Sequence, residues 1–168
     1  MYSGLLEGFY EKGMVDSDPL VDYLKDVFEQ FDYNIKKMVT VTATSIDNGS
    51  VQVFTEKNTD LKDFPMAVVS SSSIPFVFPH RRLRDQELMD GGMTYGTNPV
   101  GAVERCREAG YDDKNIVLDI ILCWGNKLEH SEMQESTTIG NFMRSWDIEN
   151  QYHSMTDVYE FMGAYPNV

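Results

Sequence analysis

The stretch "LMDGGMTYGTNPV" holds the residues best suited to chemistry, because it places Asp90 directly before Gly91 and Gly92. The residues "ELMD" predict a short strand that ends at Asp90. At the end of such a strand in an α/β sheet, a side chain faces the crevice where these folds bind ligands, and two glycines permit close approach of a substrate. Asp90 is therefore a candidate general base. The alternative is that Asp-Gly only forms a turn.

A carboxylate base that activates a hydroxyl needs a nucleophile, and the usual serine motif is missing. None of the serines in the 168 residues has glycine at both the −2 and +2 positions, so the sequence contains no Gly-x-Ser-x-Gly nucleophile elbow. Four consecutive serines occur at Ser70 to Ser73. We expect their hydroxyls to bond to backbone carbonyls rather than to attack a substrate.

One basic cluster stands out in an acidic chain, and it follows two aromatic residues. Arg81, Arg82 and Arg84 come shortly after Phe76 and Phe78. Arginines beside aromatic side chains suit contact with anionic lipid headgroups while the rings enter the interface, so Phe76, Phe78, Arg81 and Arg82 are candidate lipid contacts. The alternative is solvated charge pairing with the acidic residues that follow the cluster.

The residues that most often bind metals are dispersed. His80, His130 and His153 lie far apart, and Cys106 and Cys123 do not form a CxxC pair. Because zinc sites use closely spaced ligands, we expect no metal site. No organic cofactor is implied either.

The N-terminal half predicts a helix, a hairpin and a second helix. Asp18 and Pro19 begin a helix that extends to about Tyr33. The β-branched run at residues 37–46 and the "VQVF" run after "DNGS" predict two strands joined by an Asn-Gly turn. "DFPMAVVSSS" predicts a short helix entered through Pro65, and "IPFVFPHRRLRDQ" predicts a surface loop because it carries two prolines.

The C-terminal half predicts further alternation of helices and strands. Residues 100–109 look helical, with Gly110 as the cap. "NIVLDIILCW" is typical of a strand buried on both faces of a parallel sheet, and residues 139–162 show a long helical pattern. Such alternation predicts a layered α/β fold.

Composition restricts the partners. The chain of 168 residues is 42% hydrophobic, which suits one globular domain, and its net charge of −13 excludes nucleic acid as a partner. The longest apolar run, residues 116–124, contains Asp119 and falls far short of the roughly 20 residues that span a bilayer. The N-terminus has no signal-peptide pattern. We expect a cytoplasmic protein, at most peripheral to a membrane.

Two stretches of the sequence, residues 67–79 and 88–100, together resemble a known protein family. "AVVSSSSIPFVFP" followed by "LMDGGMTYGTNPV" resembles the patatin-like phospholipase family, which shows a serine-rich helix, an Ile-Pro loop ending in proline, and Asp-Gly-Gly followed by Asn-Pro. The resemblance runs from about residue 2 to about residue 125. It implies a layered α/β/α patatin-like fold, with residues 1–168 forming a single domain that is incomplete at its N-terminus. Residues 126–168 would be a helical C-terminal extension.

The resemblance also implies an activity. Family members are serine acyl hydrolases that cleave glycerolipid or phospholipid esters with a Ser-Asp dyad, so Asp90 would be the dyad base and Gly91 and Gly92 would shape its turn. In the family order, the glycine-rich oxyanion loop and the nucleophile elbow precede the residues that open this chain. We therefore expect the chain to be inactive alone. The alternative is a non-catalytic module that binds or regulates at a membrane or lipid-droplet surface.

Overall fold

The computed structural model describes residues 13–122, 127–133 and 137–168. The chain divides into two compact units, an N-terminal unit that ends at Thr94 and a C-terminal unit that begins at Tyr95. The single domain expected for residues 1–168 stays a prediction.

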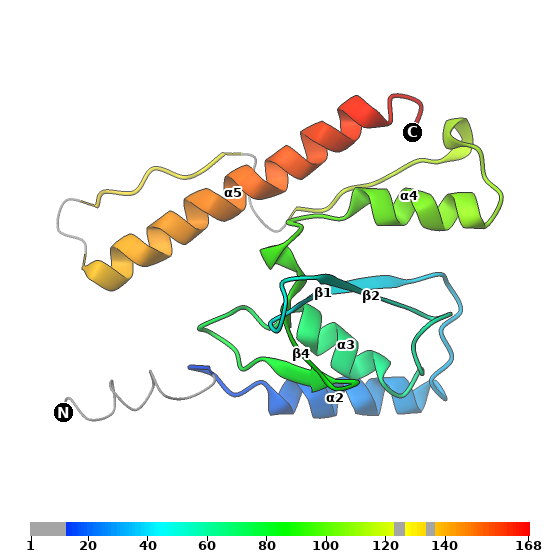
Figure 1. The fold of residues 1–168 in the computed structure, drawn as a ribbon, viewed down its shortest axis with the longest axis horizontal. Coiled ribbons are helices and arrows are strands. Elements are labelled where there is room, and N and C mark those ends of the chain that lie inside the picture. Colours follow the sequence, from blue (N-terminus) through cyan, green and yellow to red (C-terminus); the bar gives the residue numbers. More distant parts are fainter. Residues whose placement is uncertain (1–12, 123–126, 134–136) are drawn as a thin grey trace. The chain divides into compact units, whose positions relative to one another are not determined.

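The N-terminal unit contains a four-stranded antiparallel sheet with helices (Figure 1). Its described elements are α2 (Asp18–Gln30), β1 (Thr40–Ser45), β2 (Val51–Thr55), α3 (Phe64–Ser71), β3 (Arg81–Leu83), β4 (Gln86–Asp90) and the short 3-10 helix η1 (Gly91–Met93). The strand order is β2-β1-β4-β3. Helix α3 contacts β1, β3 and β4, and α2 packs against α3. The confirmed fold class is therefore mixed α/β.

Helix α2 begins where the sequence predicts and ends earlier. Pro19 lies in its first turn, which suits a residue without a backbone N–H. Its C-terminal boundary follows from the next residues, because Asp32 and Tyr33 have φ angles of 51° and 53°. A right-handed helix cannot continue through that region of backbone conformation.

The β1–β2 hairpin confirms the predicted pair of strands. Gly49 has a φ of 71°, which glycine adopts without strain. The side chain of Asn48 accepts a hydrogen bond from the backbone N–H of Ser50 at 2.9 Å. Asn48 and Gly49 thus form the turn of this hairpin, as the sequence predicts.

The loop predicted for "IPFVFPHRRLRDQ" is wrong in its second half, where β3 forms a hairpin with β4. Leu83 pairs with Gln86, and the two residues between them, Arg84 and Asp85, have φ angles of 51° and 62°. Two positive φ angles are typical of the turns that join hairpin strands. This hairpin is hard to predict from the sequence, because its turn is Arg-Asp instead of the usual Asn-Gly and β3 has only three residues.

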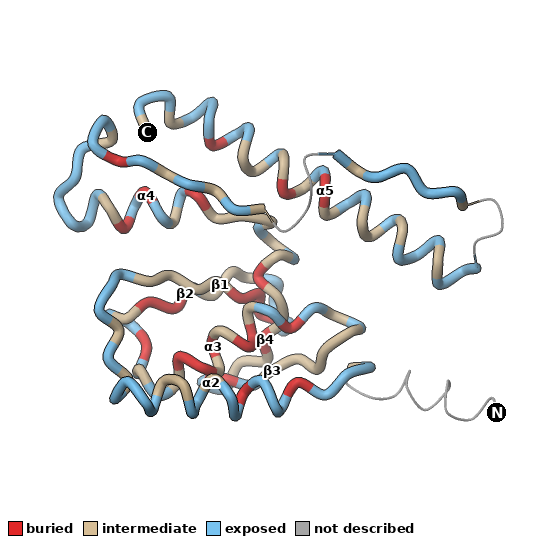
Figure 2. Tube along the Cα trace, turned by 180° about the vertical axis from the view of Figure 1, so that it is seen from behind, coloured by how far each residue is buried: buried red, intermediate tan, exposed pale blue. Residues whose placement is uncertain are grey.

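The core of the N-terminal unit lies between the sheet and α3. Its buried members come from strands and helix alike, and they are Ala43, Phe54, Ala67, Leu83 and Leu88. Buried positions of this unit are drawn in red in Figure 2 and include much of α3 and the adjoining strands. Burial of these apolar side chains holds β4 in the sheet.

The C-terminal unit is helical in the part that the structure describes. It contains α4 (Pro99–Glu108), the 3-10 helix η2 (Asp113–Asn115) and α5 (Thr138–Ala164), which confirms the two predicted helices. Val103, Ile116 and Phe161 form its buried cluster. Among the described residues, no helix combines the length and apolar composition that crossing a bilayer requires.

The buried parallel strand predicted for "NIVLDIILCW" is wrong where the structure describes it. Residues 116–122 form no strand, and Val117 and Ile121 are 88% and 90% exposed. A strand buried on both faces needs neighbouring strands, and the described part of this unit has none. Cys123 and Trp124, which end the predicted strand, lie outside the described residues.

The burial of Leu88 predicts how much a cavity in the core lowers the stability of the fold. Leu88→Ala removes a side chain that is 0% exposed at the centre of the sheet, so we expect a loss of about 2–5 kcal/mol in the free energy of unfolding. Urea denaturation followed by circular dichroism measures it. Val53→Ala, at a residue of edge strand β2 that is 45% exposed, is the matched control and should change the midpoint little. Equal losses in both variants would contradict this core.

Candidate active site

Asp90 is the last residue of β4, a strand with neighbours on both sides. On one side, Asp90 pairs with Ala43 of β1. Its own backbone N–H donates a hydrogen bond to the carbonyl of Ser73, just after α3, at 3.0 Å. Strand pairing and the segment after α3 together fix the position of this residue.

Gly91 and Gly92 turn the chain sharply after Asp90. Asp90 Oδ1 accepts a hydrogen bond from the backbone N–H of Gly92 at 2.6 Å, which caps the 3-10 helix. A Cβ atom at position 91 would lie 2.4 Å from the carbonyl oxygen of Thr42, and one at position 92 would lie 2.9 Å from Asp90 Oδ1. Side chains at either position would therefore push against the strand or against the carboxylate.

Two threonines support the same turn, and sequence reasoning missed both. Thr94 Oγ1 donates a hydrogen bond to the carbonyl of Gly91 at 3.2 Å and lies 3.1 Å from Thr44 Oγ1. Thr44 is 50 residues away in the sequence. Only the pairing register of β1 and β4 brings the two hydroxyls together, so no local pattern could have found them.

Burial sets the electrostatics of the carboxyl group. Removal from water raises the pKa of Asp90, and the hydrogen bond from the Gly92 N–H opposes that shift with a smaller effect. The charged form is thus less favoured than in water, which makes the carboxylate a stronger base. Such a group can accept a proton from a nearby hydroxyl.

Three of the four consecutive serines at the end of α3 donate hydrogen bonds to backbone carbonyls, as expected. Ser70 Oγ donates to the carbonyl of Met66, and Ser73 Oγ donates to the carbonyl of Val69, each at 2.8 Å. Ser72 Oγ also reaches the carbonyl of Val69, at 3.2 Å. These hydroxyls satisfy helix carbonyls rather than present a nucleophile.

The candidate lipid contacts have different surroundings, and Arg81 is largely enclosed. Its Nη1 lies 2.5 Å from Asp18 Oδ1 and its Nη2 lies 2.5 Å from Ser17 Oγ, with 12% of the side chain exposed. The guanidinium group thereby ties β3 to the start of α2. Phe76 is 39% exposed, and Phe78 is half-buried.

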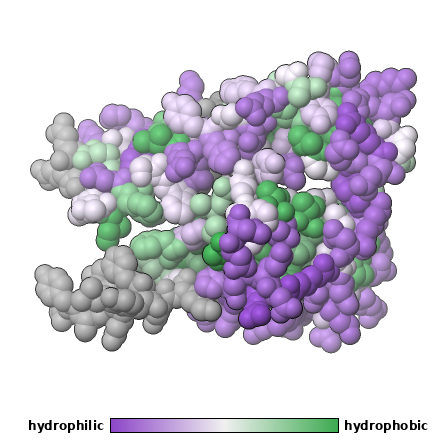
Figure 3. Space-filling model, viewed as in Figure 1, coloured by the Kyte–Doolittle hydropathy of each residue, from purple (hydrophilic) through white to green (hydrophobic). Residues whose placement is uncertain are grey.

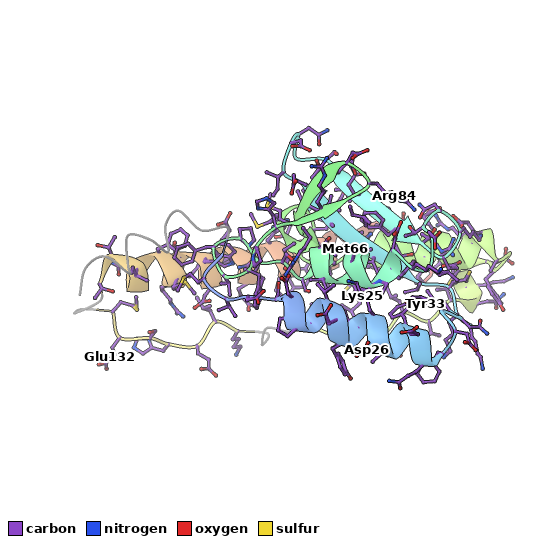
Figure 4. The ribbon with its side chains drawn as sticks, turned by 90° about the horizontal axis from the view of Figure 1, so that it is seen from below. Lys25, Asp26, Tyr33, Met66, Arg84 and Glu132 are labelled. Carbon is purple, nitrogen blue, oxygen red and sulfur yellow. The ribbon has the colours of Figure 1, made fainter. Side chains whose placement is uncertain are left out.

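The other two arginines of the basic cluster also have partners. Arg82 is 67% exposed and lies 3.3 Å from Asp85 Oδ1. Arg84, labelled in Figure 4, donates a hydrogen bond to the carbonyl of Asn58 at 2.9 Å. The pair of Arg82 with Asp85 agrees with the alternative interpretation of this cluster, whereas the expected partner Glu87 lies beside His80. A lipid-contact role for Arg81 and Arg82 stays a prediction.

Metal ligands do not gather among the described residues. No group of three or more His, Cys, Asp or Glu side chains in that part of the chain could hold a metal ion. His80 Nε2 lies 3.2 Å from a carboxylate oxygen of Glu87, and His153 Nε2 lies 4.0 Å from one of Asp157.

The fold and site thus define a mixed α/β protein with a half-buried carboxylate at a strand end. A family model described as patatin-like phospholipase matches residues 2–103, a span that includes Asp90 and both glycines. The chain therefore belongs to the patatin-like phospholipase family, whose members are lipid acyl hydrolases. No curated protein compared with the chain matches it.

The raised pKa of Asp90 predicts a pH-dependent stability difference. The folded state holds the proton more tightly than the unfolded state, so stability falls as pH rises from the unfolded pKa, about 3.9, through the folded pKa. Asp90→Asn removes the buried charge and keeps an acceptor for the Gly92 N–H. We expect its melting temperature to exceed that of the unmodified chain by a few degrees at pH 7, and the difference to shrink below pH about 4.

Thermal scans across this pH range measure the effect. Asp85→Asn is the matched control, because it also neutralises an aspartate but at a side chain that is 96% exposed. An Asp90→Asn variant that melted below the unmodified chain at pH 7 would show that the buried charge does not carry this cost.

Proposed function

We propose that Asp90 is the base of a Ser-Asp dyad in a lipid acyl hydrolase. The observation that carries this proposal is the half-buried carboxylate at the end of β4, which a Gly-Gly turn presents and whose pKa burial raises. Membership of the patatin-like phospholipase family supports a lipid ester as the substrate class.

The two oxygens of the carboxylate have different tasks in this proposal. Oδ1 accepts the Gly92 N–H, which holds the orientation of the group. Among the described residues Oδ2 has no hydrogen-bond donor, and we assign it as the proton acceptor. A carboxylate with an ordinary pKa of about 3.9 is a weak base for an alcohol, so the burial of Asp90 is a requirement of the mechanism.

The reaction proceeds through an acyl-enzyme. Asp90 takes the proton from a serine hydroxyl as its oxygen attacks the ester carbonyl, and backbone N–H groups stabilise the oxyanion. The tetrahedral intermediate collapses, and the departing alcohol takes the proton from Asp90. Water then attacks the acyl-serine while Asp90 accepts its proton, and the proton returns to the serine as the fatty acid leaves.

The serine of this mechanism is not in a nucleophile elbow of these 168 residues, because no Gly-x-Ser-x-Gly occurs among them. We therefore propose that the 168-residue chain alone does not hydrolyse esters. Catalysis needs a polypeptide that supplies the elbow and the oxyanion N–H groups beside Asp90.

A serine-directed fluorophosphonate probe tests the dyad. We expect no labelling of the 168-residue chain alone. In the longest product of the native transcript we expect a labelled serine, and Asp90→Asn should slow its labelling by about 10²–10⁴-fold, the range for loss of a general base. Time-resolved gel fluorescence measures the rate.

Asp85→Asn is again the matched control and should label at the unmodified rate, since its exposed carboxylate lies in the β3–β4 turn. Labelling of the 168-residue chain by itself would overturn the need for a separate elbow. Unchanged labelling of the Asp90→Asn variant would overturn the role of Asp90.

A further inference from the structure

Four exposed apolar residues gather where the start of the described chain meets the segment after α3. Backbone hydrogen bonds join the two strips, from the N–H of Met14 to the carbonyl of Phe76 at 3.2 Å and from the N–H of Val15 to the carbonyl of Val77 at 2.9 Å. The exposed fractions are 64% for Met14, 50% for Val15, 37% for Ile74 and 39% for Phe76. We refer to these four residues as the apolar loop.

The apolar loop has a defined conformation. The backbone N–H of Phe78 donates to the carbonyl of Ile74 at 2.9 Å, which closes a tight turn around Phe76. Phe76 has a φ of 72°, and a bulky aromatic residue adopts this conformation only when its surroundings impose it. Gly13 contributes, because a Cβ there would lie 2.4 Å from the backbone nitrogen of Pro79.

The apolar loop adjoins the candidate active site within the same unit. Ser73, whose carbonyl accepts the backbone N–H of Asp90, directly precedes Ile74. Figure 3 shows apolar surface, in green, on the side of the N-terminal unit where the segment after α3 lies. A lipid held at the apolar loop would therefore lie close to the end of β4.

The charges around the apolar loop do not suit an anionic surface. Arg81 is enclosed by Asp18 and Ser17, and Arg82 lies beside Asp85. Asp16, next to Val15, is exposed, and the whole chain carries a net charge of −13. Anionic headgroups would be repelled, whereas burial of the apolar side chains remains favourable at an uncharged surface.

We propose that the apolar loop inserts into a zwitterionic or neutral lipid surface and brings the ester of a lipid to the site beside Asp90. The delivery of an ester to Asp90 rests on the proposed function, whereas the insertion into a lipid surface does not. Affinity comes from the apolar side chains, and the arginines after them serve the fold. This assignment differs from an electrostatic membrane contact, which would use Arg81 and Arg82.

Sedimentation of the chain with phosphatidylcholine vesicles tests the proposal. We expect the unmodified chain to bind, and Met14→Glu and Phe76→Asn each to weaken binding by at least about tenfold, equivalent to about 1.4 kcal/mol. Asparagine tolerates a positive φ better than phenylalanine, so Phe76→Asn should leave the fold intact. Circular dichroism checks the folding of each variant.

The matched control is Tyr23→Glu, which also adds a carboxylate at an exposed apolar residue, because Tyr23 is 63% exposed on α2. It should bind within about twofold of the unmodified chain, as expected for a residue outside the contact. Arg82→Gln should also bind normally, and added phosphatidylserine should weaken binding. Asp90→Asn should retain binding, so failure of the catalytic proposal would be distinguishable from failure of this one.

Three results would overturn the proposal. Equal binding by Met14→Glu, Phe76→Asn and the unmodified chain would show that the apolar loop is not the contact. Binding that required phosphatidylserine and disappeared in high salt would assign the contact to the arginines. No binding of the unmodified chain to either vesicle would leave a protein partner as the occupant of this surface.

Discussion

The close approach of Gly91 to the carbonyl of Thr42 is the constraint on which the site geometry depends. The chain passes so close to β1 that no Cβ fits at this position, and this contact turns the backbone directly after Asp90. The carboxyl group of Asp90 can then accept a hydrogen bond from the N–H of Gly92, two residues further on. Thr94, at the end of the same turn, and Thr44, on the neighbouring strand β1, support this geometry with their hydroxyl groups.

Two opposing effects act on the carboxyl group held there. Burial makes ionisation of Asp90 costly, and the Gly92 N–H recovers part of that cost. Because burial has the larger effect, the fold keeps a carboxylate that is more basic than an exposed aspartate would be. The proposed role of Asp90 as a general base would use this basicity, which gives a reason for a group that lowers the stability of the fold in its charged form.

Two arginines of the basic cluster hold parts of the N-terminal unit together. Arg81 joins β3 to the start of α2, and Arg84 bonds to the carbonyl of Asn58. The exposed apolar side chains beside them are therefore the stronger reason to expect a lipid surface nearby. Interfacial binding through apolar insertion needs no positive patch when the lipid itself is uncharged.

Local signals in the sequence determined much of this molecule. The Asn-Gly turn, Pro19, Pro65 and the long helical pattern near the C-terminus each act over a few residues, and α2, the β1–β2 hairpin, α3 and α5 form where they predict. Asp90 and its glycines were also recognisable, because a strand followed by Asp-Gly-Gly is a local pattern. Tertiary structure alone decided the contacts between distant residues, namely the Thr44–Thr94 pair and the enclosure of Arg81 by Asp18. The β3–β4 hairpin is local, but its Arg-Asp turn is not a usual turn sequence. It also decided residues 116–122, whose apolar pattern fits a strand but which find no neighbouring strand among the described residues. A strand exists only through hydrogen bonds to another strand, and a buried charge only through what surrounds it, so neither can be determined from a short stretch of sequence.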